Sequence, residues 1–60
     1  MDAIVKEQIL AVRDTGEANM FEVNTVAQIA MREGFYELVV YLQDHRKEYC
    51  HFILCGKEDA

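Results

Sequence analysis

The chain has 60 residues, 52% of them hydrophobic, and carries 11 acidic against 6 basic side chains for a net charge of −5. This length allows one domain at most and leaves no room for the cleft and substrate pocket of an enzyme. The acidic balance opposes nonspecific binding to nucleic acid and to anionic membrane faces. We therefore expect a single, non-enzymatic domain over residues 1–60.

A domain of this size gains little more from burying apolar surface than it loses in conformational entropy, so it needs disulfides, a metal or a second chain. Cys50 and Cys55 lie five positions apart in a segment with a helical pattern. Helical geometry separates their Cα atoms by about 8–9 Å, beyond the roughly 7 Å limit for a disulfide. We expect reduced thiols in a cytoplasmic protein, with a bridge from one cysteine to a partner chain as the alternative.

The first expected helix spans about residues 3–14. Asp2 is a suitable N-cap, and Gly16 can take the left-handed conformation that ends a helix. An apolar stripe runs along the helix at intervals of four and three residues: Val5, Ile9 and Val12. The following segment, residues 17–23, has no clear period but is too apolar for a solvated loop, so we expect it to be pinned onto the core.

The second expected helix spans about residues 25–33. Asn24 is a suitable N-cap, and Thr25 with Gln28 fits the capping-box pattern. Three apolar residues face one way: Val26, Ile29 and Ala30. Gly34 closes the helix.

The third expected helix is the longest and spans about residues 35–55, followed by a polar tail over 56–60. A heptad-like seam runs along it at alternating spacings of three and four: Phe35, Leu38, Leu42, His45, Tyr49 and Phe52. A second apolar line lies about 100° away: Tyr36, Val40 and Leu54. A helix apolar over this much of its circumference must be surrounded, and two short helices cover only one side. The alternative is that residues 49–54 form a short strand.

The pattern thus predicts an all-α, three-helix mini-domain with a long C-terminal helix that forms a homodimer. The long helix supplies much of the interface, backed by the apolar faces of the two shorter helices. The residues predicted to contact the second copy or another partner are Phe35, Leu38, Leu42, Tyr49, Phe52, Tyr36 and Tyr41.

Side chains able to bind metal or act as nucleophiles gather near the C-terminus: Asp44, His45, Cys50, His51 and Cys55. His51 and Cys55 share a helix face because they are four residues apart, whereas His45 and Cys50 point elsewhere. Structural zinc sites usually combine two closely spaced ligand pairs, and the sequence has no second pair. A Cys–His dyad here lacks a surrounding pocket. We predict no metal, no cofactor and no catalytic residue.

The alternative to a protein-binding module is a helix-turn-helix regulator that binds DNA. Residues 26–35 resemble its first half, because Ala30 and Gly34 have the four-residue spacing that allows close packing at the turn. Residues 36–42 then offer apolar groups and a carboxylate where a recognition helix presents basic groups. Imitation of nucleic acid is a weaker alternative, because the acidic residues are interspersed with basic ones.

The sequence contains no recognisable membrane or targeting segment. The longest uninterrupted apolar run, residues 38–42, is far below the roughly 20 residues that cross a bilayer. Residues 1–3 lack the basic flank of a targeting signal. We expect a soluble, cytoplasmic protein with no membrane partner.

Five blocks in combination resemble a family of very short proteins built on a domain of unknown function, met mainly in phages and integrated elements of Gram-positive bacteria. The blocks are 6–16 (KEQILAVRDTG), 19–21 (NMF), 34–39 (GFYELV), 45–49 (HRKEY) and 52–54 (FIL). The resemblance covers almost the whole chain and carries over no catalytic residue. It implies a phage accessory protein that works in the host cytoplasm. Such proteins commonly bind and alter a host or phage protein, for instance by inhibiting a host defence factor, and the partner's identity stays open.

Overall fold

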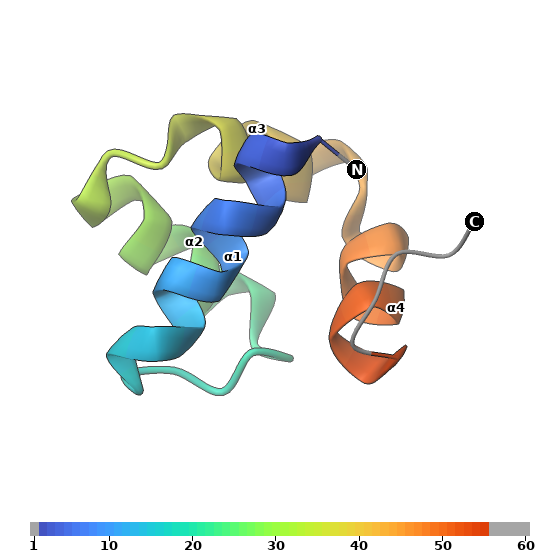
Figure 1. Cartoon of the computed structure of the whole chain (residues 1–60), viewed down its shortest axis with the longest axis horizontal. Helices are drawn as coiled ribbons and strands as arrows, with labels where there is room; N and C mark the ends of the chain where they lie inside the picture. The colour runs from blue at the N-terminus through green and yellow to red at the C-terminus, as the bar shows by residue number, and fades with distance from the viewer. Residues whose placement is uncertain (1, 56–60) are drawn as a thin grey trace.

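A computed structural model describes residues 2–55, and the regular structure within them is entirely helical. Figure 1 shows the helices in chain order: α1 (Ala3–Thr15), α2 (Val23–Glu33), α3 (Tyr36–Asp44) and α4 (Arg46–Cys55). α1 lies across α2 and α3, and α4 turns away from the end of α3 at the other side of the molecule. The all-α class is confirmed. The predicted tail over 56–60 lies outside the described residues.

The predicted count of three helices is wrong, because the long helix expected over 35–55 divides at His45. The His45 backbone has φ −131° and ψ 42°, which is not helical, although its N–H still donates to the Tyr41 carbonyl at 2.8 Å. The Tyr49 N–H donates to the His45 carbonyl at 3.0 Å and so begins the hydrogen bonding of α4. Residues 49–54 stay helical, so the strand alternative is also wrong.

The break at His45 allows one chain to enclose its own apolar seam. α4 turns at the break, and Tyr49 and Phe52 pack into the same core as Leu38 and Leu42. His45, expected on this seam, is instead exposed and its ring stacks on Tyr41 with centroids 4.9 Å apart. The buried residues come from all four helices: Val5, Ile9, Val12, Val26, Ile29, Ala30, Leu38, Val39, Leu42, Tyr49 and Phe52. The inward faces predicted for the first two helices are confirmed.

The start of α1 is as predicted and the start of α2 is not. The Asp2 side chain accepts a hydrogen bond from the Ile4 N–H at 3.2 Å. α2 begins two residues before the predicted helix, at Val23, so the predicted N-cap at Asn24 and the capping box of Thr25 and Gln28 are both wrong. A turn over residues 19–22 leads directly into the helix. The Glu22 N–H donates to the Asn19 carbonyl at 2.9 Å, and the Phe21 N–H donates to the Asn19 side chain at 3.0 Å. Asn24 instead accepts from the Arg46 guanidinium at 3.3 Å.

The segment between α1 and α2 is pinned onto the core, as predicted. Met20 packs partly buried against the core, and its carbonyl accepts a 2.6 Å hydrogen bond from the Tyr49 hydroxyl. Glu17 receives two hydrogen bonds from the Arg32 guanidinium at 2.9 and 2.6 Å, which lower the pKa of Glu17. Phe21 is the exception, with 52% of its surface exposed. The loop is therefore held at both ends by side chains from other helices.

Gly34 ends α2 in the left-handed conformation, with φ +79°. A Cβ added there meets no atom within 4 Å, so an alanine changes only the backbone preference. We expect Gly34→Ala to lower the free energy of unfolding by about 1 kcal/mol in urea titrations. A D-alanine at position 34, introduced by chemical synthesis, is the matched control and should cost nothing, because D residues favour positive φ. Equal stability of the two alanine variants would contradict a left-handed Gly34.

Candidate protein-binding groove

An open groove of about 500 Å³ runs along α3 beside the start of α1. Its apolar part consists of Val5 from α1 with Tyr36, Val40 and Tyr41 from α3. Tyr36 and Val40 lie one helical turn apart and keep 59% and 58% of their surface exposed. Tyr41 is half-buried between this surface and the ring of His45. The groove thus presents two adjacent apolar side chains that no described part of the chain covers.

Three carboxylates border the groove: Asp2 at the start of α1, and Glu37 and Asp44 from α3. Glu37 accepts a hydrogen bond from the Gln8 amide at 3.0 Å, and this bond is the main reason that the pKa of Glu37 lies below its usual value. Asp44 is the last residue of α3, where the helix dipole is also negative. α3 contains no Lys or Arg. His45, which follows Asp44, completes the lining. The groove thus combines four apolar or aromatic side chains with three carboxylates and one histidine.

Gln8 connects α1 to the start of α3 and holds the Glu37 side chain, which lines the groove. Its side-chain carbonyl accepts a 2.9 Å hydrogen bond from the Leu38 N–H, which has no partner within its own helix. Its amide group donates to Glu37 at the same time. Sequence analysis missed Gln8, because a polar residue on the exposed side of an apolar stripe gives no signal. The contact depends on where α3 crosses α1.

The residues predicted as an interface do not form one surface. Leu38, Leu42, Tyr49 and Phe52 lie in the core of the single chain, where 0%, 2%, 0% and 8% of their surfaces are exposed. Phe35 and Tyr41 are half-buried, and Tyr36 is exposed. Only Tyr36 and Tyr41 of this set line the groove. An interface role for the whole set stays a prediction, and the four core residues can serve it only if the core opens.

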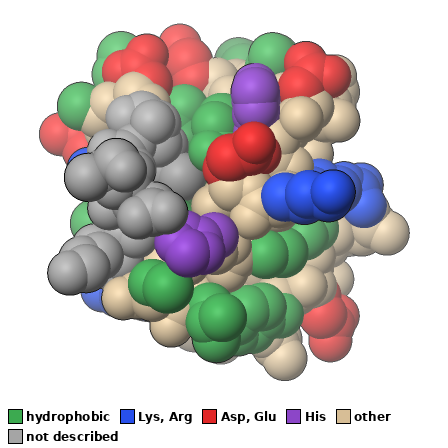
Figure 2. Space-filling view, turned by 90° about the vertical axis from the view of Figure 1, so that its right-hand side faces the viewer, with side chains coloured by type: hydrophobic (Ala, Val, Ile, Leu, Met, Phe, Trp, Pro, Cys, Tyr) green, Lys and Arg blue, Asp and Glu red, His purple; other side chains and the backbone are tan. Residues whose placement is uncertain are grey.

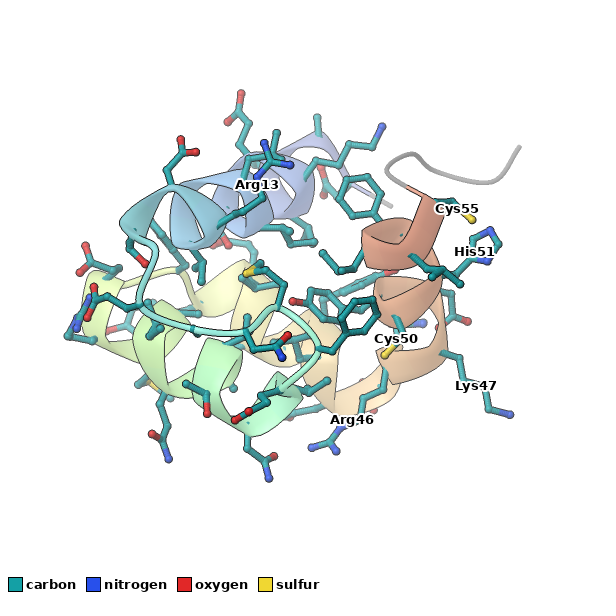
Figure 3. The ribbon with its side chains drawn as sticks, turned by 90° about the horizontal axis from the view of Figure 1, so that it is seen from below. Arg13, Arg46, Lys47, Cys50, His51 and Cys55 are labelled. Carbon is teal, nitrogen blue, oxygen red and sulfur yellow. The ribbon has the colours of Figure 1, made fainter. Side chains whose placement is uncertain are left out.

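Of the chemistry-bearing side chains near the C-terminus, Asp44 and His45 line the groove, whereas Cys50, His51 and Cys55 lie on α4 and do not. Figure 3 shows the Cys55 sulfur beside the His51 ring, with both side chains directed away from the body of the molecule and Cys50 apart from them. Both cysteines are free thiols. Within residues 2–55, no three His, Cys, Asp or Glu side chains come together in a way that could hold a metal ion. No helix in the same range is long and apolar enough to cross a membrane.

Surface charge is unevenly spread around α4. Figure 2 shows acidic and hydrophobic side chains alternating along the upper edge of the face that contains α4, while basic side chains gather at its right. Arg46 and Lys47 begin α4. The groove is lined by residues of α1 and α3 and by His45, and neither Arg46 nor Lys47 lines it.

Over residues 2–55, these features define a small four-helix, all-α domain with an apolar groove bordered by carboxylates. The chain belongs to a family known as domain of unknown function DUF5049, whose family model matches residues 1–57. The expected membership of a domain-of-unknown-function family is thereby confirmed. No curated protein and no solved structure matches the chain.

Proposed function

We propose that the protein is a non-enzymatic protein-binding module that holds a basic, amphipathic helix of another protein in the groove along α3. The observation that carries the proposal is the pair of exposed apolar side chains, Tyr36 and Val40, bordered by carboxylates. Aromatic side chains in such positions commonly dominate the affinity of protein interfaces. A contiguous exposed apolar surface rimmed by polar side chains is a recognised feature of protein interaction sites.

The shape and charge of the groove favour a helical occupant with Lys or Arg at its edges. α3 has nine residues, so the groove is about 13 Å long and accommodates two to three turns of a partner helix. Asp2, Glu37 and Asp44 all line the groove, and the chain as a whole has a net charge of −5. Complementary charge speeds association and excludes acidic competitors.

The resemblance to proteins of phages and integrated elements supports a more specific role. A small accessory protein in the host cytoplasm acts by binding and altering a host or phage protein, and inhibition of a host defence factor is one such action. This host–virus interaction requires neither a cofactor nor a catalytic residue.

Affinity capture with a matched pair of variants tests the proposal. Immobilised wild-type chain should retain a partner from lysate of the cells that encode it, and Tyr36→Ala/Val40→Ala should lose that partner. Both residues are exposed, so the double variant should remain folded. Met31→Ala is the control, because Met31 is 53% exposed on α2 and does not line the groove. Retention of the same partner by the double variant, or no partner at all, would contradict the proposal.

The helix-turn-helix alternative draws support from the order α2, Gly34, α3 and from the burial of Ala30 at the turn. It is disfavoured by α3, which would present two carboxylates and no basic group to the DNA. DNA binding predicts affinity for duplex DNA that falls steeply with salt. We expect no mobility shift even at low salt, and a salt-dependent shift would favour the alternative.

A further inference from the structure

The outer face of α4 combines two metal-binding side chains with an exposed leucine. His51, Leu54 and Cys55 occupy positions i, i+3 and i+4, which share one face of a helix. Leu54 is 75% exposed, the highest value among the large hydrophobic residues of the described chain. Tyr49 and Phe52, on the opposite face, hold α4 against the core. Among the described residues, the core thus packs against the opposite face of α4 and not against His51, Leu54 and Cys55.

The spacing of His51 and Cys55 fits two ligands of one tetrahedral zinc ion. The Cys55 Sγ lies 3.7 Å from Nε2 and 4.0 Å from Nδ1 of His51. Zinc bonds of about 2.3 Å to sulfur and about 2.0 Å to nitrogen, at tetrahedral angles, place the two ligand atoms about 3.6 Å apart. The observed separation of Cys55 Sγ and His51 Nε2 is therefore close to the one that a shared zinc ion requires. Thiolate and imidazole are also the ligand types that zinc prefers.

One chain supplies only half of a closed zinc site. Structural zinc has four protein ligands, and the described residues of one chain bring no third ligand to this pair. Cys50 is apart from the pair in Figure 3. A second copy related by two-fold symmetry presents the same surface and can contribute the same two residues. Two thiolates also balance the two positive charges of zinc, so the closed site adds no charge to an acidic chain.

We propose that His51 and Cys55 from two copies of the chain bind one zinc ion and that the exposed Leu54 side chains pack against each other beside it. This site joins two chains through α4 in a metal-dependent dimer. The bound zinc adds to the hydrophobic core the further stabilisation that a 60-residue domain needs. It shares no residue with the groove along α3, so it stands or fails independently of the proposed function.

Sedimentation velocity with Zn²⁺ alone as the ligand tests the site. The full chain is kept reduced with a phosphine, which prevents an intermolecular disulfide, and is freed of metal beforehand. We expect the 7.0 kDa monomer to become a dimer of twice that mass when one Zn²⁺ is present per two chains. Co²⁺ should give the near-ultraviolet absorption of a cobalt–thiolate bond at the same ratio.

Four variants establish which side chains of α4 bind the metal. Cys55→Ser and His51→Ala should lose both the mass change and the cobalt–thiolate absorption, whereas Cys50→Ser, the matched control, should retain both. Leu54→Ser should need more Zn²⁺ to dimerise. Circular dichroism confirms that each variant is folded. A chain that stays monomeric with Zn²⁺, a dimer that forms without metal, or a loss of binding in Cys50→Ser would each overturn the proposal.

Discussion

Tyr49→Ala should remove a large share of the protein's stability. Tyr49 is the largest fully buried side chain, and its hydroxyl donates to the Met20 carbonyl at 2.6 Å. Truncation of a buried aromatic residue costs about 3–5 kcal/mol, while a 60-residue domain has a total stability of roughly 3–9 kcal/mol. Both α4 and the loop before α2 lose their main attachment. Urea unfolding followed by circular dichroism at pH 7 measures the loss.

Tyr36→Ala is the control for this substitution, because 59% of the Tyr36 surface is exposed, and it should change stability by less than about 0.5 kcal/mol. Similar losses in both variants would contradict the packing of α4 against the core. Such a result would instead favour the single helix over residues 35–55 that the sequence predicts.

Tyr49 also predicts a pH dependence at the alkaline end. Burial raises the pKa of Tyr49 from 10.0 to about 12. Because the folded state holds the proton more tightly, this stabilisation is fully present below pH 10 and is lost as the pH rises from 10 towards 12. Tyr49→Phe should make the unfolding free energy fall less steeply over that range. An unchanged pH profile in Tyr49→Phe would show that another group causes the alkaline loss.

Leu38→Ala is the second large effect. Leu38 has no exposed surface and packs where α3 crosses α1. Removing a buried leucine side chain costs about 2–5 kcal/mol, depending on how far the cavity collapses. Thermal and urea unfolding at several protein concentrations measure this cost. It should be the same at every concentration, because Leu38 is covered by its own chain.

Val40→Ala is the matched control on the same helix, with 58% of Val40 exposed, and it should be nearly neutral for stability. A cost of Leu38→Ala that grows with protein concentration would place Leu38 in an interface, as the sequence pattern predicts. A greater loss in Val40→Ala than in Leu38→Ala would mean that α3 faces the core with its other side.

Hydrophobic spacing was sufficient to predict which faces of the helices are buried. Val5, Ile9 and Val12 repeat at helical intervals on one face, and all three are in the core. The same spacing could not reveal the break at His45. The apolar seam continues in register from Leu42 to Tyr49, and a seam that stays in register looks identical whether it faces a second chain or folds back on its own. No glycine or proline marks the position.

The groove was predictable only in part. Tyr36 and Val40 were recognised as one apolar line on the long helix, and their exposure follows because the opposite face of α3 is buried. The contribution of Val5 and Asp2 depends on the tertiary crossing of α1 over α3, which local patterns do not encode. The alignment of Glu37 by Gln8 depends on the same crossing. A site that forms where two helices cross can be predicted only after the fold is known.

Site-specific photo-crosslinking tests the central claim, that the groove along α3 is the surface that binds a partner. A benzophenone amino acid replaces Val40 in the groove or, as the control, Met31 on α2, and the chain is irradiated in the cells that encode it. Both positions are more than half exposed, so both probes reach solvent. We predict a crosslink to a distinct protein from position 40, absent from position 31 and weakened by Asp44→Asn. Crosslinks from position 31 and none from position 40 would contradict the account.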